Sequence, residues 1–373
     1  MLKISFRLFR AVLFCFVLCS CESGSNTNTI ITIEDITIED KERNDSYFVP
    51  DYYKKHVSEK EEYINSSINK ANGDYAAMLF FTDAHWGDNQ KNTPFLINHI
   101  IHNTPIRDVF FGGDVITTRY DNPEDAIQLL KCFRQAFDTL KCNKYYLYGN
   151  HDNNSDHYPE DLSRHIPEEQ VYYYLQNGMS SNYYGGYYNF YLDREKCKTR
   201  YICLDTGRYY YPQLREPTIN TVQFLINTLN TAREGWRIVL FSHMWCDLSF
   251  DKPRRPFINE HIGAIIRVLD DYNSRDVSCY RYKDKIINYD FSNASSKIIC
   301  CIGGHCHVDT VTSSESGIPI IITTTDSLQT VNEESASIGT IEEQSISAFV
   351  IDYGHSVLKM YRIGRGNDLS ISI

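Results

Sequence analysis

The sequence lacks an excess of positive charge. Its 373 residues carry 37 Lys and Arg against 48 Asp and Glu, which gives a formal net charge of -11. A protein that binds the phosphate backbone of nucleic acid usually presents a cluster of basic residues. The composition therefore argues against a nucleic-acid partner, although it leaves room for a local basic patch.

The N-terminal apolar run is too short to cross a membrane. Ala11 to Cys19 spans far fewer than the about 20 residues that a bilayer requires, but it follows basic residues and suits the core of a signal peptide. Leu18 to Cys21 resembles a bacterial lipobox, which implies cleavage before Cys21 and acylation of its thiol. An ordinary secretory signal is the alternative. We predict a lipoprotein-type signal peptide over residues 1–20 and a lipid anchor on the extracytoplasmic side of a bacterial cell envelope.

The cysteines do not form an evident disulfide framework. Nine of them follow Cys21, so at least one is unpaired or pairs between molecules. A domain of this size needs no disulfides, and most of its cysteines are expected to be small buried apolar residues. A bridge between Cys197 and Cys203, which flank a predicted hairpin turn, is left open.

The rest of the chain divides into a polar lead-in and one domain. Residues 21–70 include the acidic near-duplication ITIEDITIED, and this composition predicts a tether and lead-in. Over residues 71–373, apolar strands alternate with helical patterns, which is typical of α/β proteins. Strands are predicted at 76–83, 108–114, 144–152, 199–207, 237–243 and 297–307, helices at 94–103, 124–140, 218–232 and 258–273, and a closing hairpin at 345–364.

Polar side chains lie at or just after the carboxyl ends of five of these predicted strands. They are Asp83 and His85; Asp114; Asn150, His151 and Asp152; His243; and His305 and His307. Ligand sites of open α/β sheets lie at the carboxyl ends of strands. Each motif alone is weak, because an Asp at a strand end is often a helix cap. In the order D-x-H, GGD, GNHD, FSH and GHCH, the five together are highly specific.

This ordered set resembles the calcineurin-like metallophosphoesterases, over about residues 75–364. The resemblance implies an α/β fold in which two mixed β-sheets pack as a sandwich flanked by helices, with a dinuclear metal site. It implies that the first metal is bound by Asp83, His85 and His307, that the second is bound by Asn150, His243 and His305, and that Asp114 bridges both. His151 would assist the leaving group, and Asp152 would orient it.

Phosphate ester hydrolysis calls for these residue types. Carboxylate, amide oxygen and imidazole suit divalent Mn, Fe, Zn or Ni, and no thiolate is needed. Two such cations neutralise the phosphoryl oxygens and hold a bridging hydroxide in line with the leaving group. Lowering the pKa of a bound water from about 16 to about 7 reduces the free energy of its deprotonation at neutral pH by roughly 12 kcal/mol. The implied substrate is a phosphate monoester, diester or pyrophosphate, with the leaving group left open.

The stretch KIICCIGGHCHVD, residues 297–309, clusters Cys and His residues in a way that is typical of zinc sites. An extended chain alternates sides at every residue, so His305 and His307 are expected to point one way and Cys306 the other. On this interpretation each histidine serves one metal, and the cysteines do not bind metal.

Three residues are weaker candidates for substrate contacts: Arg119, Trp86 and Trp245. The expected partners are a phosphorylated small molecule and, through Cys21, a lipid membrane. Two alternatives stay open. A nuclease would share these motifs, but the acidic charge and the predicted location disfavour it. A binding module with an inactive site is disfavoured because all seven predicted ligands and His151 are present.

Overall fold

The computed structural model describes residues 47–86, 88–117, 120–155, 160–177, 183–184, 188–207, 217–245, 260–282, 284–328 and 337–373. The predicted signal peptide (1–20), the predicted lipidation site Cys21 and the candidate contact Arg119 lie outside these ranges. None of the helices within them is long and apolar enough to cross a membrane.

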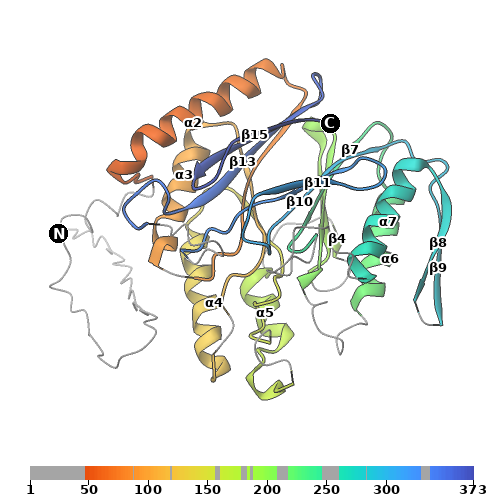
Figure 1. Cartoon of the computed structure of the whole chain (residues 1–373), viewed down its shortest axis with the longest axis horizontal. Coiled ribbons are helices and arrows are strands. Elements are labelled where there is room, and N and C mark those ends of the chain that lie inside the picture. Colours follow the sequence, from red (N-terminus) through yellow and green to blue (C-terminus); the bar gives the residue numbers. More distant parts are fainter. Residues whose placement is uncertain are drawn as a thin grey trace, which may run out of the picture.

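Two β-sheets face each other at the centre of the molecule (Figure 1). The first contains β1 (Tyr75–Phe81), β2 (Asp108–Phe111), β3 (Asn143–Tyr146), β13 (Ser345–Asp352), β14 (Val357–Gly364) and β15 (Leu369–Ser372). Its order is β15-β14-β13-β1-β2-β3. The second contains β4 (Tyr183–Tyr184), β5 (Phe190–Arg194), β6 (Thr199–Leu204), β7 (Arg237–Ser242), β10 (Lys297–Gly303), β11 (Thr310–Ser313) and β12 (Pro319–Ile322). Its order is β11-β12-β10-β7-β6-β5-β4.

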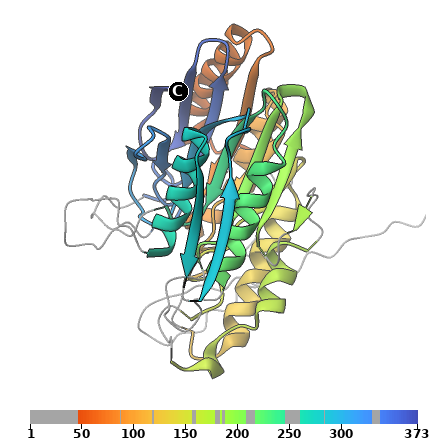
Figure 2. The same cartoon turned by 90° about the vertical axis from the view of Figure 1, so that its right-hand side faces the viewer.

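Helices cover the outer faces of both sheets. The first sheet carries α2 (Asp51–Lys70), α3 (Thr93–Asn103), α4 (Pro123–Asp138) and α5 (Glu168–Leu175), and the second carries α6 (Pro217–Asn230) and α7 (Glu260–Ser274). A separate hairpin of β8 (Val277–Tyr282) and β9 (Lys285–Asp290) lies beside α7 (Figure 2). Short 3₁₀ turns occur at Asp88–Lys91, Leu162–Arg164 and Glu195–Cys197.

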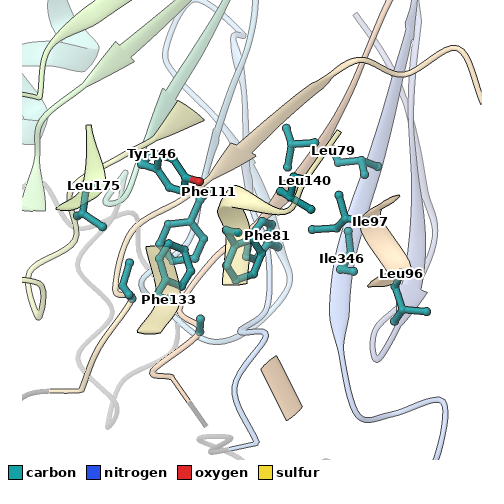
Figure 3. Close-up of a cluster of buried hydrophobic side chains, with 14 of the residues drawn as sticks. Leu79, Phe81, Leu96, Ile97, Phe111, Phe133, Leu140, Tyr146, Leu175 and Ile346 are labelled. Carbon is teal, nitrogen blue, oxygen red and sulfur yellow. The ribbon is translucent and has the colours of Figure 1, made fainter. Parts of the chain in front are cut away.

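Side-chain alternation along the strands builds the layers. In β1, Met78 and Phe80 point into the apolar layer between the sheets, while Leu79 and Phe81 point into the layer under the helices. Figure 3 shows this second layer, which includes Phe81 of β1 and Phe133 of α4; Phe81 stacks on Phe137 of the same helix. A sheet with two apolar faces must be covered on both. The predicted sandwich of two mixed sheets flanked by helices is therefore confirmed.

The folded domain begins earlier than residue 71, which corrects the predicted boundary. Helix α2 lies within the expected lead-in, yet its Val57 and Ile64 are fully buried and belong to the same core cluster as β1. Polar residues dominate this helix, so its composition alone predicts a tether. Only its sparse apolar positions, three to four or seven residues apart, carry the packing face.

Parallel pairing brings together the carboxyl ends of the strands that precede the predicted metal ligands. Strands β1, β2 and β3 run parallel in the first sheet, and β6, β7, β10 and β12 run parallel in the second. Parallel strands place their carboxyl ends at the same edge of a sheet. Every loop that carries a predicted metal ligand starts from one of these strands.

Candidate metal centre

The predicted metal ligands converge at the carboxyl edges of the two sheets. Their ligand atoms fall into three overlapping groups, each within 4.8 Å: Asp83, His85 and His307; His85, Asp114 and His151; and Asp114, His243 and His305. Asn150 joins the last group, because its Oδ1 lies 3.0 Å from His243 Nε2. Residues from five loops and both sheets therefore meet at one place.

Asp83, His85 and His307 form one half of the centre. His85 Nε2 lies 3.1 Å from His307 Nε2, which in turn lies 3.3 Å from Asp83 Oδ1. His85 Nδ1 lies 3.2 Å from the carbonyl oxygen of Ile116. Because a carbonyl only accepts, this contact places the proton on Nδ1 and turns the lone pair of Nε2 toward the other ligands.

His243 organises the other half in the same way. Its Nδ1 donates to the carbonyl oxygen of Gly112 at 2.8 Å, which turns Nε2 inward, where it offers a lone pair to a cation once its own proton is lost. There Nε2 meets Asn150 Oδ1 at 3.0 Å and Asp114 Oδ2 at 3.2 Å. Three electron-pair donors thus face one another, an arrangement that requires either a proton or a cation between them.

The donor set fits divalent cations. Asp83 Oδ1 is buried and has no hydrogen-bond donor in bonding geometry, which is costly for a charged oxygen unless a cation compensates. Asp114 lies between the two halves: its Oδ1 accepts from the backbone N–H of His151, and its Oδ2 faces His243. The oxygen and imidazole donors suit Mn, Fe, Zn or Ni, as the sequence predicts, and the identity of the metal stays a prediction.

The pKa values of the histidines at the site are shifted by burial and by the charges of the neighbouring carboxylates and histidines. Burial lowers the pKa of His243, but the carboxylates of Asp114 and Asp83 outweigh this effect and raise it to about 10. This proton occupies the region where the negative field would hold a cation. Burial, with charge from neighbouring histidines, lowers the pKa of His85 to about 4 and that of His305 to about 3. Both rings are therefore neutral at pH 7, which is the form that binds metal.

Backbone strain is concentrated on the predicted ligands. Five of the seven adopt left-handed φ values between 43° and 70°: Asp83, His85, Asp114, His305 and His307. Such conformations cost a non-glycine residue about 1–3 kcal/mol each and persist only where the surroundings hold them. Backbone bonds between loops do so here, with Asp83 N–H donating to the Gly113 carbonyl at 2.9 Å and His85 N–H donating to that of Asp114 at 3.1 Å.

His151 lies beside the predicted ligands, and its side chain is more exposed than those of Asp83, Asp114 and His243. Its side chain is 22% exposed, and its Nε2 lies 3.7 Å from Asp114 Oδ2. Its ring meets that of His85 edge-on, with centroids 5.0 Å apart. It is close enough to complete a ligand group with His85 and Asp114. Its exposure, close to the 17% of His307, makes it a candidate to contact a substrate.

Asp152, which the resemblance predicts to orient His151, accepts hydrogen bonds from main-chain N–H groups. Asp152 Oδ2 accepts the N–H groups of Gly149 at 2.7 Å and Asp114 at 3.1 Å, while Oδ1 accepts that of Val115 at 2.7 Å. Asp152 is completely buried. It therefore joins the loop after β3, which carries His151, to the loop after β2, and it positions His151 through the main chain.

The side-chain directions expected for the GHCH motif are observed, but for another reason. Strand β10 ends at Gly303, so residues 305–307 are not extended as predicted, and His305 and His307 adopt left-handed turns. Both rings join the ligand groups, while Cys306 is buried in the core under α6 and α7. Cys197 and Cys203 are both free, so the bridge left open between them is not formed.

Two of the weaker candidates have different surroundings. Trp245 is only 1% exposed, packs in the core of the second sheet and donates its indole N–H to the Ile302 carbonyl at 2.8 Å. Core packing leaves it almost no surface for a substrate, which corrects the predicted contact. Trp86 is partly buried and packs edge-on against Phe133, with ring centroids 6.0 Å apart.

Comparison with known proteins decides the family. The profile of the calcineurin-like phosphoesterase family matches residues 77–309, more than half of the chain. The chain belongs to the calcineurin-like phosphoesterase family. With its His and Asp ligand groups, it is a metal-dependent phosphoric ester hydrolase. A search of the curated proteins found no match.

Solved structures are similar to this chain at low sequence identity, and the first of those named here supports the fold. A dimetal phosphatase from Danio rerio is 14% identical, covers 79% of this chain and 98% of its own, and superposes with a TM-score of 0.51. A phosphopantetheinyl hydrolase from Mycobacterium tuberculosis is 11% identical, with 68% and 91% covered and a TM-score of 0.32. A protein serine/threonine phosphatase from Saccharomyces cerevisiae is 9% identical, with 87% and 93% covered and a TM-score of 0.28.

One segment lies at the site although the sequence motifs do not predict it. Residues 323–327 follow β12, whose carboxyl end lies at the same edge as those of β7 and β10. The signal was present as PIIITTTD, a strand pattern followed by hydroxyl side chains and a carboxylate. The segment matches none of the motifs D-x-H, GGD, GNHD, FSH and GHCH, so those motifs do not predict its place at the site.

Proposed function

We propose that this metallophosphoesterase hydrolyses a phosphate monoester or diester with two divalent cations. Asp83, His85 and His307 would hold the first cation, and Asn150, His243 and His305 the second, with Asp114 shared. The convergence of the His243 Nε2 lone pair with Asn150 Oδ1 and Asp114 Oδ2 carries the proposal. Either a proton on His243 or a cation must lie between these three atoms, and a bound cation would displace that proton.

The cations would neutralise the phosphoryl oxygens and supply a nucleophile from water at neutral pH. The side chains provide the rest. The Ile116 and Gly112 carbonyls fix the tautomers of His85 and His243, so that both Nε2 lone pairs face the reacting region. His151 Nε2, at the more exposed border, is placed to donate a proton to the departing oxygen.

Metal analysis combined with two assays tests this function. The purified chain is expected to contain close to two divalent ions per molecule and to hydrolyse an aryl phosphate, a bis-aryl phosphate or both. Chelation should abolish turnover, and added Mn should restore it. A chain that binds no metal and shows no turnover with added Mn would contradict the proposal. The ratio of the two activities assigns the monoester or the diester class.

Replacing His151 with Ala should separate substrates by their leaving groups. Loss of a proton donor is expected to lower kcat/KM for an alkyl phosphate by about 10²–10⁴-fold, because an alkoxide leaves poorly without a proton. A nitrophenyl ester should lose much less, since nitrophenolate leaves unprotonated. His355→Ala, at an exposed hairpin turn, serves as the control. Equal activity of His151→Ala and the wild type on the alkyl ester would show that the assigned role is wrong.

We further propose that the domain is anchored outside the cytoplasmic membrane through acylated Cys21. The support is the lipobox-like end of the N-terminal apolar run and the polar composition that follows it. Metabolic labelling with a fatty acid, compared between the wild type and Cys21→Ala, tests this location. Trp86 and Arg119 stay proposed substrate contacts.

A further inference from the structure

The segment Thr323–Ser327, here called the β12 loop, contacts both loops that carry the ligands of the proposed first metal. The Thr325 hydroxyl donates to the carbonyl oxygen of Asp83 at 2.6 Å. The Thr324 hydroxyl donates to the carbonyl oxygen of His307 at 2.8 Å. Since Asp83 follows β1 of one sheet and His307 follows β10 of the other, the β12 loop joins the two sheets at the site.

These two threonines hold the main chain where it is strained. Asp83 and His307 both have left-handed φ values, 53° and 55°, which side-chain-bearing residues rarely adopt. A hydrogen bond to the carbonyl of such a residue fixes the orientation of the peptide group that follows it. Thr325 is fully buried and Thr324 is 9% exposed, so water cannot readily replace a lost hydroxyl.

The β12 loop is itself rigidly anchored. The Asp326 carboxylate accepts the Ser345 backbone N–H at 2.7 Å and the Thr93 hydroxyl at 3.0 Å. The Asp326 backbone N–H donates to the carbonyl of Thr82, next to Asp83, at 2.9 Å. The Arg365 guanidinium donates to the Ser327 carbonyl at 2.8 Å.

A second anchor lies on the His307 side. Asp309, two residues after His307, accepts the Thr324 backbone N–H at 2.9 Å. The same oxygen of Asp309 accepts from the guanidinium of Arg362, which is only 1% exposed. The loop is therefore held from several elements, which a positioning element requires, because a flexible partner could not hold a strained backbone.

We propose that the β12 loop positions the first metal, with Thr325 and Thr324 acting on Asp83 and His307 through their carbonyl groups. This inference rests on the proposed function and adds to it two residues that touch neither metal nor substrate. It also assigns the effect to one metal of the two, because these hydroxyls act on ligands of the first metal.

Calorimetric titration of the metal-depleted full chain with Mn²⁺ and with Zn²⁺ tests the assignment. Thr325→Val keeps the shape of the side chain and removes the hydroxyl. We expect one of the two binding events to weaken by about 10-fold and the other to stay as in the wild type. Thr325→Ser, which restores the hydroxyl, should recover the affinity. Thr324→Val should weaken the same event, and it is a second variant if Thr325→Val does not fold.

Thr323→Val is the matched control. This neighbour is buried too, but its hydroxyl makes only a long contact of 3.4 Å to the Gly303 carbonyl. It should keep both metal affinities. Thermal unfolding of the metal-free variants separates a general loss of stability from a change at the site.

The outcomes separate this inference from the proposed function. A wild-type chain that binds no metal would contradict the proposed function. A wild type that binds two metals, with Thr325→Val and Thr324→Val retaining both affinities, would overturn only the positioning role. Equal weakening of both events, or equal effects in Thr323→Val, would also overturn it.

Discussion

Asp114→Asn is expected to reduce kcat by about 10³-fold or more, with loss of at least one bound metal. The Asp114 carboxylate is 1% exposed and lies between the two halves of the centre, with Oδ2 3.2 Å from His243 Nε2. Asn preserves the volume but removes the charge and one anionic oxygen. Losing a shared ligand charge costs several kcal/mol of transition-state stabilisation, at about 1.4 kcal/mol for each factor of ten.

Metal content and steady-state rates of the purified variant measure this effect. Asp125→Asn, on the exposed first turn of α4, is the control and should keep two metals and wild-type turnover. A circular dichroism spectrum like that of the wild type would show that the variant folds. If Asp114→Asn retained both metals and at least a tenth of the activity, the shared-ligand assignment would be contradicted.

Gly149→Ala should destabilise the protein by about 3 kcal/mol and disturb metal binding. A Cβ at this position would lie 2.1 Å from both the backbone nitrogen and Oδ1 of Asp114. The neighbour cannot move away, because its N–H is held by the Asp152 carboxylate. Overpacking against fixed backbone typically costs 1–3 kcal/mol, so a clash this close belongs at or above the upper end.

Urea unfolding of the metal-free protein measures this loss of stability. Gly354→Ala is the matched control, because a Cβ there would meet only Asp352 Oδ1, at an ordinary 3.6 Å. The control should unfold within about 1 kcal/mol of the wild type. Equal midpoints for the two variants would contradict the close approach of the β2 and β3 loops.

Much of the centre could be predicted from sequence because its ligands are local to strand ends. An apolar strand pattern followed by Asp, Asn or His marks a carboxyl edge, and parallel strands bring such edges together. The predicted ligands Asp83, Asp114 and His243 therefore meet in the structure as the motifs indicated. The α/β class follows from the same alternation of strand and helix patterns, and the three-dimensional arrangement confirms it.

Other features depend on partners far away in the chain. The polar composition of α2 predicts a tether, because only the apolar face of the first sheet shows where Val57 and Ile64 pack. The GHCH residues were predicted to be extended, whereas bonds to neighbouring loops hold His305 and His307 in left-handed turns.

The sequence by itself determined which side chains could bind metal and in what order along the chain they occur. Only the tertiary structure decided how they are held. Thr325 lies 242 residues from Asp83 along the chain, and Asp152 acts on backbone N–H groups rather than on a side chain. Hydroxyl and carboxylate side chains show in the sequence which residues could bond to the main chain, but a long-range bond has no fixed spacing, so the sequence does not show which main-chain atom is the partner.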